Sequence, residues 1–515
     1  GAHDLLHGGG AARAVGHQAD GLDAAHTVGL GDARDLHRVE HHGIDALVLC
    51  AGRAGNNFRH TRHLGERGGH HDGRGQGGRA SGNVKPDAFE GREGFAEEAA
   101  VAEARRKKIE HGPGNGCQRR QQRFHSGLDE IGGLVARAVL DDGTAVDRFY
   151  HAILPGDRHV LDLCAEHGLG DGVRFGETRT GVYRQGRLYP LNTVLDLLRF
   201  PPLPPLDRLR LGATVLVARG VRDWERLEDV PVEEWLTRYS GRRAVDVLWR
   251  AMLRAKFDGG FADTPATYIW SRLVRVQSAK SGAAQREGAG YLPGGYGALV
   301  EAMAQRVRGA GGEIHLQSPV LEIVTEGDRA VGVRTASGVS LHDSVVATVP
   351  LPALCPILPD AAAGYVHALR QVEHLDIICP LLVLDRPLSG YWTLYIAAED
   401  VPFTGIIETT SYVDPAWVGG HHLVYLPKYV RPGSPWHALS DEEIGAVWFE
   451  HLQRMFPDFR REWVHEYHVH RAYHVEPLHG MHGNPAIPSI RTPIRRLYLA
   501  AAAQIYPALT SMESV

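Results

Sequence analysis

Histidine and cysteine are the residue types in this chain best suited to bind a metal or to form cross-links. The chain has 30 histidines, including the pairs His41-His42 and His70-His71, but their spacing does not match a set of metal ligands on a helix or in a loop. The cysteines form no CxxC pair and no disulfide framework. They are Cys50, Cys117, Cys164, Cys355 and Cys379. We therefore expect no metal site and a reducing compartment.

The overall composition is that of an ordinary globular protein. The formal net charge of −5 gives no reason to expect a nucleic-acid partner. No apolar run approaches the ~20 residues of a membrane-spanning helix, and the N-terminus has no signal-peptide pattern. The expected location is cytoplasmic, and the sequence does not indicate an oligomeric state.

The composition changes abruptly near residue 130. Every Trp, Tyr and Met lies at Tyr150 or beyond, whereas residues 1–128 are crowded with Gly, His and Arg. Only Ile44 to Cys50 predicts a buried strand there. Three interpretations are open: a disordered tail, a His-rich metal site, or a GC-rich gene translated in a wrong frame. We favour the third, which agrees with a first methionine at Met252, and leave residues 1–128 unassigned.

From Asp129 onward the pattern is that of an α/β protein. Residues 131–150 predict strand, turn and strand, and GVYRQGRLYPL predicts a hairpin with Gln185-Gly186 as its turn. Residues 194–260 predict helices, one of them starting after Pro231. The run FPPLPPL (200–206) predicts a stiff connector. Its apolar residues fit an ordinary helix–helix connection better than the alternative, a weak peripheral contact with a membrane surface.

Residues 291–350 carry the most informative pattern. YLPGGYGALVEAMAQRVRGAGG predicts a glycine loop leading into an amphipathic helix that ends at Gly311-Gly312. Short strands are expected at 313–317, 320–326, 330–335 and 340–350, with turns between them. Near the C-terminus, RRLYLAAAAQIYP (495–507) predicts a strand that leads into a polar tip at Gln504.

This order of glycine loop, helix, β-meander and D-x-V-V-x-T-x-P resembles the FAD-dependent superfamily of protoporphyrinogen oxidase and the flavin amine oxidases, and most of all its bacterial protoporphyrinogen-oxidase-like members. The resemblance implies an α/β fold in which an FAD/NAD(P)-binding Rossmann-like domain is interleaved with an α+β substrate domain. The FAD-binding domain is expected at 129–150, 288–350 and 490–515. The substrate domain is expected at 151–287 and 351–489, with a sheet around 375–385 and 421–430.

The resemblance also implies bound FAD, which is expected to be non-covalent because the C-terminal flavin-lining segment has no cysteine. Gly132-Gly133 matches the turn that approaches the pyrophosphate, where a Cβ would block the backbone. Val320 matches the valine beside the adenine, and Gln504 lies where the C-terminal stretch lines the flavin ring. The simpler explanations are a hairpin turn, a core valine and a strand end. The full expected set is Gly132, Gly133, Leu134, Val320, Thr348, Pro350, Gln504, Ile505 and Met512.

One departure from the family pattern stands out. The strand, GxGxxG turn, helix and acidic strand end that open the family are not found before the doublet. Gly8-Gly9-Gly10 has no strand before it, and Asp129 and Glu130 lie too close to the glycines to bind the adenine ribose. The expected Rossmann-like domain is therefore incomplete at its N-terminus.

The chemistry implied is hydride removal from a small-molecule substrate to the flavin. No residue stands out as a catalytic acid or base, and the strand expected at 375–385 lacks the lysine of amine oxidases, which weakens amine oxidation. Lys256, Arg272, Arg275 and Tyr506 are expected near a cleft between the domains, although each also fits a surface or structural role. Two alternatives stay open: a non-redox flavin-dependent sugar-nucleotide mutase, and a non-catalytic remnant unable to bind FAD.

Overall fold

The computed structural model describes residues 36–41, 44–51, 130–278, 280–281, 286–481, 487–508 and 511–514. All of them belong to one unit, made of residues 1–53 and 125–515. Residues 1–128 contribute two described strands, β1 (Leu36–His41) and β2 (Ile44–Ala51), so the strand expected at Ile44 to Cys50 is confirmed. The rest of that segment lies outside the described residues. Within the described part of the chain, no helix is long and apolar enough to cross a membrane.

A four-stranded sheet joins two strands of the expected FAD-binding part to β1 and β2 of the unassigned residues 1–128. Its order is β1-β2-β13-β20, where β13 is Ser344–Ala347 and β20 is Leu497–Leu499. β13 and β20 are parallel, as in dinucleotide-binding sheets, but β2 is antiparallel to β13. A separate meander consists of β10 (Glu322–Glu326), β11 (Arg329–Thr335) and β12 (Gly338–Leu341). The meander and β13 share one core with α10 (Leu351–Leu354) and α11 (Ala363–Leu369).

The meander differs from the expectation at both ends. The strand expected at 313–317 is wrong, because this segment is irregular and ends in a turn with Gln317 at φ 54°. A strand needs a partner with which to exchange backbone hydrogen bonds, and none of the described strands pairs with this segment. The strand expected at 340–350 is divided into β12 and β13 by a break at His342-Asp343.

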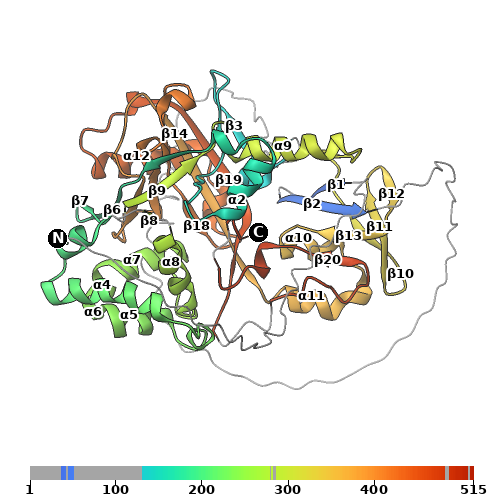
Figure 1. The fold of residues 1–515 in the computed structure, drawn as a ribbon, viewed down its shortest axis with the longest axis horizontal. Coiled ribbons are helices and arrows are strands. Elements are labelled where there is room, and N and C mark those ends of the chain that lie inside the picture. Colours follow the sequence, from blue (N-terminus) through green and yellow to red (C-terminus); the bar gives the residue numbers. More distant parts are fainter. Residues whose placement is uncertain are drawn as a thin grey trace, which may run out of the picture. The chain divides into compact units, whose positions relative to one another are not determined.

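An eight-stranded sheet forms the expected substrate domain (Figure 1). Its order is β18-β14-β17-β16-β15-β6-β7, with β19 also paired to β14. The strands are β6 (Thr180–Arg184), β7 (Arg187–Pro190), β14 (Glu373–Leu384), β15 (Thr393–Ile396), β16 (Gly405–Glu408), β17 (His422–Tyr425), β18 (Lys428–Val430) and β19 (Val464–Leu478). The hairpin β6–β7 turns at Gln185-Gly186, both with positive φ, as expected.

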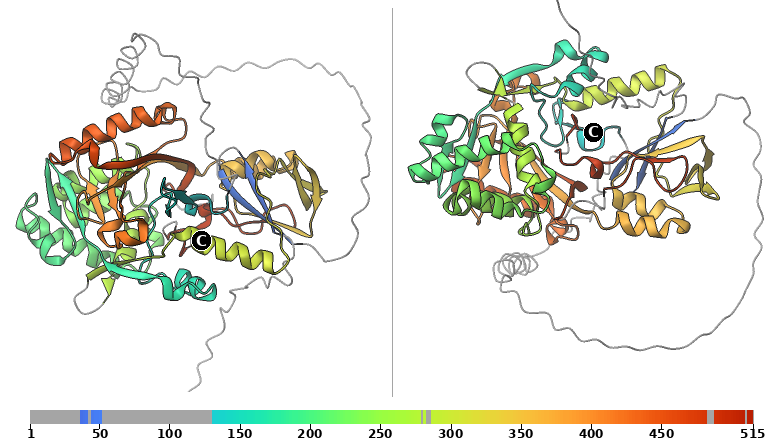
Figure 2. Two further views of the ribbon diagram at one scale, coloured as in Figure 1. Left: turned by 90° about the horizontal axis from the view of Figure 1, so that it is seen from above. Right: turned by 60° about the horizontal axis from the view of Figure 1, so that its bottom comes forward.

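The two faces of this sheet are covered by different elements. Successive residues of a strand point to opposite faces. On β14, Ile378 and Leu382 pack with helix α12 (Asp441–Met455). On the other face, Ile377 and Leu381 pack with the hairpin of β3 (Arg137–Val139) and β4 (Ala145–Asp147). Figure 2 shows α12, in orange, lying along the strands. The sheet is therefore buried on both faces, which explains the nearly continuous apolar run of β14.

A group of helices follows β7, as expected for residues 194–260. It contains α3 (Val194–Leu198), α4 (Pro205–Gly220), α5 (Val232–Ser240), α6 (Arg242–Ala244), a π-helical turn at Val245–Trp249, α7 (Arg250–Lys256) and α8 (Thr267–Ser278). Their buried side chains form one core with Val182 of β6 and Leu375 of β14. Another core joins α2 (Arg158–Glu166) to α9 (Tyr296–Gly309). Two further strands, β5 (Arg174–Glu177) and β9 (Arg286–Tyr291), pair with each other, and β8 (Lys280–Ser281) pairs with β9.

Candidate functional site

A small cavity of about 40 Å³ lies where α8, the end of β19 and the C-terminal stretch meet. It is lined by Phe257, Thr264, Pro265, Thr267, Tyr268, Ser271, Arg272, Glu476, Pro477, Leu478, His479, Ile505, Tyr506, Pro507 and Ala508. The lining includes Arg272 and Tyr506, which the sequence placed near a cleft, and Ile505, which it placed beside the flavin. Residues far apart in the chain are thus brought to one site.

Two lining residues, Glu476 and Arg272, form an ion cluster with Lys256, which is not itself among the residues that line the cavity. Glu476 binds Arg272 with an N–O distance of 2.8 Å and pairs with Lys256 through its other oxygen. All three are largely buried, with 15–25% of the side chain exposed. Each cation also lies over an aromatic ring, Lys256 at 3.2 Å from the centre of Tyr429 and Arg272 at 3.3 Å from that of Tyr268. The cluster carries two positive charges and one negative charge.

Burial sets the proton affinities in the cluster. Loss of water lowers the pKa of Lys256 to about 8, although the negative charge of Glu476 opposes this shift. Burial by itself would raise the pKa of Glu476, but the charges and hydrogen bonds of Lys256 and Arg272 outweigh it, so the pKa of Glu476 is lowered. Burial also raises the pKa of Tyr268 and Tyr429, which therefore stay neutral. Lys256 is the member of the cluster that can exchange a proton near neutral pH.

Aromatic side chains form the rest of the wall. The hydroxyl of Tyr506 lies 2.8 Å from that of Thr267. Trp224 stacks on Trp270 with ring centres 6.3 Å apart, and it meets Tyr506 edge-on at 5.8 Å. The indole of Trp270 donates a hydrogen bond of 2.9 Å to the carbonyl of Ala218 in α4. The cavity is thus connected to the helical group by a continuous series of ring contacts.

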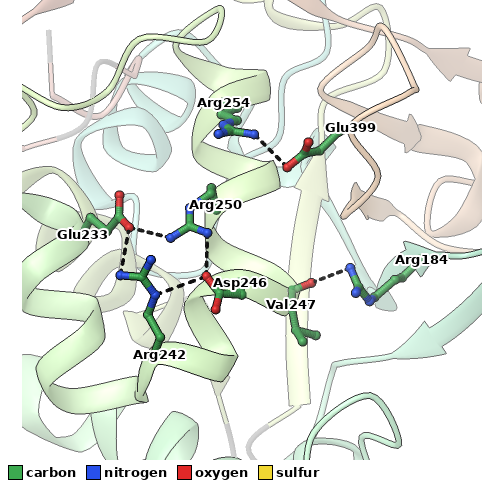
Figure 3. A network of polar contacts seen from close by, with 8 residues as sticks. All are labelled: Arg184, Glu233, Arg242, Asp246, Val247, Arg250, Arg254 and Glu399. Carbon is green, nitrogen blue, oxygen red and sulfur yellow. Dashed lines mark hydrogen bonds and ion pairs between the residues drawn. The ribbon is translucent and has the colours of Figure 1, made fainter. Parts of the chain in front are cut away.

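An arginine–carboxylate network fixes the helix that carries Lys256 (Figure 3). Arg250, at the start of α7, binds Glu233 of α5 at 2.6 Å and Asp246 of the π-helical turn at 2.5 Å. Arg242 contacts the same two carboxylates at 3.7 and 3.4 Å. Because Lys256 ends α7, these contacts hold its backbone in place. A π-helical turn is rare and is often found beside functional sites.

A bulge in β19 brings Glu476 to the cavity. Ile377 of β14 pairs with Ala472, but Leu375, two residues away, pairs with Glu476, so β19 has two extra residues at this point. His474 lies in the bulge with a φ of 55°. Its backbone N–H donates to the buried carboxylate of Asp376 at 2.7 Å, and the other oxygen of Asp376 lies 3.0 Å from Nε2 of His437. The sequence analysis did not single out Glu476, although VHEYHVHRAYHV has the alternation typical of a strand.

Another buried carboxylate, Asp147 of β4, packs against the start of α9. Asp147 is 4% exposed and accepts a 2.9 Å hydrogen bond from the backbone N–H of Tyr296, the first residue of the helix. Burial raises the pKa of Asp147 to about 7, against the opposing effect of this hydrogen bond. A Cβ at Gly295 would overlap the carboxylate. The glycine of this loop is therefore explained by helix capping and close packing.

The glycine doublet forms a tight turn that packs against the chain's own backbone. Gly132 and Gly133 have φ values of 120° and 58°, and a Cβ on Gly132 would lie 3.1 Å from backbone atoms of Ala136. A cavity of about 210 Å³ lies beside them, lined by Glu130, Ile131, Arg137, Gly297, Glu301, Arg308 and Leu316. Its two arginines and two glutamates balance in charge, so electrostatics alone does not favour a diphosphate there.

The other expected cofactor residues do not gather at one cavity. Val320 is fully buried in the meander core, while Thr348 and Pro350 are partly buried and lie between β13 and α10. Met512 packs against the core of α2 and α9, and Leu134 is 39% exposed.

Gln504 and Arg275 already have partners within the chain. The Gln504 amide accepts from the Ala501 N–H at 2.8 Å and donates to the Pro488 carbonyl at 3.1 Å, so it orders the last turn. Arg275 pairs with Asp157 at 3.2 Å.

The contacts at the doublet and at the cavity show how far the residues present could hold FAD. The glycines of the doublet are already required by packing against Ala136, whereas Ile505 and Tyr506 offer apolar and aromatic surface at the cavity. The cavity is large enough for a few water molecules, not for a flavin ring. The residues at the cavity thus fit the edge of a flavin site, the phosphate turn stays a prediction, and the first dinucleotide-binding turn is not among the described residues.

The comparisons with known proteins agree with this arrangement. Residues 127–513 match the model of the flavin containing amine oxidoreductase family. The 15-cis-phytoene desaturase of Synechococcus elongatus is 24% identical over 359 residues, which are 64% of this chain and 73% of that protein. A candidate protoporphyrinogen oxidase from Exiguobacterium sp. 255-15 has a similar structure, with a TM-score of 0.57, 19% identity and coverage of 73% of this chain and 86% of that one. Reduced UDP-galactopyranose mutase has a TM-score of 0.54 at 16% identity, covering 69% of this chain and 78% of that one. The mixed α/β fold is thus that of FAD-dependent oxidoreductases, and this chain belongs to the flavin containing amine oxidoreductase family.

Proposed function

We propose that this chain is an FAD-dependent oxidoreductase that removes hydride from a small-molecule substrate where α8, β19 and the C-terminal stretch meet, with the small cavity there widening to admit the substrate. Membership of the family supports the reaction class. The observation that carries the placement is the ion cluster of Lys256, Glu476 and Arg272, which is buried against aromatic rings at that cavity. Buried charges with a shifted pKa in a concave site are typical of functional centres.

Each part of the cavity has a role in this proposal. When bound, FAD supplies the hydride acceptor. The rings of Tyr268 and Tyr506 exclude water from the substrate. Glu476 is held ionised by two cations, which makes it a poor free base and a good anchor for both. Lys256, with its pKa lowered to about 8, can hold or release a proton at Nζ near neutral pH.

The cluster argues for a substrate that is not a simple cation. Glu476 is already neutralised by Lys256 and Arg272, and the excess charge at the cavity is positive. An ammonium group would meet the positive charge of Arg272 in the cavity wall, with that of Lys256 on the other oxygen of Glu476. Like the missing strand lysine, this weakens the case for amine oxidation.

The two alternatives make different demands on the same residues. A sugar-nucleotide mutase needs cations for a diphosphate, but Arg272 is paired with Glu476 and Arg275 with Asp157. The mutase therefore receives less support than the oxidoreductase. A non-catalytic remnant would bind no flavin even when FAD is added.

The test is flavin reduction by substrate. The full chain is mixed with FAD, freed of unbound flavin and examined for visible flavin absorbance, then incubated without oxygen with amine and non-amine candidates. We expect bound flavin, bleaching by a non-amine compound, and loss of at least tenfold in the bleaching rate in Glu476→Gln. Glu466→Gln is the matched control, because Glu466 is a buried carboxylate on the same strand, 7% exposed and paired with His468. Absence of bound flavin would support the remnant, and turnover only after chemical reduction would support the mutase.

A further inference from the structure

Exposed apolar side chains are concentrated on α3 and α4. On α3, Val194, Leu195 and Leu198 are 66%, 51% and 41% exposed. On α4, Leu206, Leu209 and Leu216 are 70%, 58% and 67% exposed. Scattered exposed leucines are normal on a protein surface, but a group of this density within one short segment marks an interaction site.

The spacing on α4 shows that this group forms a continuous stripe. Leu206, Leu209, Ala213 and Leu216 follow the i, i+3, i+7, i+10 pattern of one helix face, and all are exposed. The opposite face carries Leu211, Thr214 and Ala218, which are buried in the helical core. Since the core needs only one of these two faces, the second apolar face is free for another partner.

The two helices pack against each other. A Cβ on Gly212 of α4 would lie 3.2 Å from the side chain of Leu197 in α3, so the helices are in direct contact. We define the apolar face as Val194, Leu195, Leu198, Leu206, Leu209, Ala213 and Leu216. The connector expected at 200–206 has Phe200 and Leu203 buried, and it leads directly into this face.

The charges around the apolar face are mainly positive. Arg199, Arg219 and Arg222 are exposed, and within the described residues no ion pair involves any of them. Within residues 194–222, five arginines outnumber two aspartates, and the acidic residues Asp223 and Glu225 follow only after this segment. Asp196 accepts hydrogen bonds from the backbone at the start of α3, and Asp207 lies 4.0 Å from Arg243. An apolar stripe with basic residues at its ends matches a helix that lies in the interface of an anionic bilayer.

We propose that the apolar face of α3 and α4 docks on the surface of an anionic lipid bilayer, with its leucines in the acyl boundary and the arginines at the headgroups. The charge pattern favours this partner over a second copy of the chain, because two such faces would bring like charges together. The described residues contain no spanning helix, so the contact is peripheral. This proposal does not depend on the reaction proposed above.

The experiment is vesicle sedimentation with the full chain. We expect the chain to bind vesicles of phosphatidylcholine and phosphatidylglycerol mixed at about 3:1. Binding to pure phosphatidylcholine vesicles, or to the mixed vesicles at high salt, should be weaker. The variant Leu206→Ser/Leu209→Ser/Leu216→Ser should lose binding by at least about tenfold, since each buried leucine contributes up to roughly that factor. Arg219→Gln/Arg222→Gln should lose only the preference for anionic lipid.

A matched control removes the same number of exposed apolar side chains elsewhere. Val139, Leu341 and Ile490 are 66%, 73% and 65% exposed and lie outside α3 and α4. Val139→Ser/Leu341→Ser/Ile490→Ser should therefore bind vesicles like the unmodified chain. Equal loss in both triple variants, or no vesicle binding by the unmodified chain, would overturn the proposal. A dimer that dissociates in the α4 triple variant, without vesicle binding, would show that a second copy covers this face.

Discussion

The carboxylate of Asp376 holds the backbone of His474 at 2.7 Å inside the bulge of β19. Two residues later in the same strand, Glu476 reaches the cavity and binds Lys256 and Arg272. Without the two extra residues of the bulge, the strand register would place His474 opposite Leu375, in the position that Glu476 occupies. A buried residue on β14 thus determines which side chain of β19 meets the cavity.

Replacing Asp376 tests this relationship. In Asp376→Ala the His474 N–H loses its acceptor, so we expect the free energy of unfolding to fall by about 1–3 kcal/mol. The ion cluster should also be displaced, which weakens substrate-dependent flavin reduction. Asp376→Asn keeps an acceptor oxygen and should restore most of both properties. Urea denaturation and anaerobic flavin reduction provide the two measurements, and equal behaviour of the two variants would show that the hydrogen bond does not hold the bulge.

Lys256 should make stability depend on pH. Its pKa is lowered from 10.5 to about 8 by burial, so between these values the unfolded chain binds a proton that the folded chain does not. The free energy of unfolding should therefore rise with pH across this window, by roughly 3 kcal/mol at most. Urea denaturation at about pH 7 and about pH 10 measures the rise. In Lys256→Met this part of the rise should be absent, and an identical pH dependence in both proteins would contradict the shift.

The glycine doublet should be required for FAD. Gly133→Val places a branched side chain at a φ of 58° in the turn expected to meet the pyrophosphate, and we expect it to abolish FAD binding. Gly143→Val is the matched control, because Gly143 has a φ of 86° in the β3–β4 hairpin and nothing lies within 4 Å of an added Cβ. The control should lose about 1 kcal/mol of stability and keep its flavin. Fluorescence titration with FAD distinguishes the two.

Any bound flavin should be released by denaturation. Cys164, Cys355 and Cys379 are buried in hydrophobic cores, and residues 487–515 contain no cysteine. Acid or heat precipitation should therefore leave all flavin in the supernatant. Flavin that remains with the washed polypeptide would show a covalent link through another residue type.

The gene itself tests the wrong-frame interpretation of residues 1–128. β13 is parallel to β20, and the strand on its other edge, β2, is antiparallel, although a dinucleotide-binding sheet would have a parallel strand there. We predict that the DNA upstream of codon 129, read in another frame, encodes a strand, GxGxxG, a helix and a strand that ends in Glu or Asp. Resequencing and translation in all frames measure this, and stop codons throughout the other frames would show that the segment is native.

The sequence predicted the elements whose signals are local. The hairpin at Gln185-Gly186 and the helix after Gly294-Gly295 were found because their glycines are needed where φ is positive. The strand expected at 313–317 failed because its formation depends on a pairing partner elsewhere, and apolar alternation cannot show whether that partner is present. At the site, Arg272 and Tyr506 were expected near a cleft and do line one cavity. Glu476 was missed because its place depends on the bulge that Asp376 stabilises, a contact between residues 98 positions apart for which periodicity gives no signal.

The fluorescence of the stacked indoles beside the cavity can report on what enters it. Trp224 lies against Trp270 on one side and meets Tyr506, a cavity residue, on the other. A molecule that enters the cavity must touch Tyr506 or displace its water, and either event changes the surroundings of the neighbouring indole. Substrate entry should therefore be visible as a change in tryptophan emission in unlabelled protein, measured with the flavin held in one redox state.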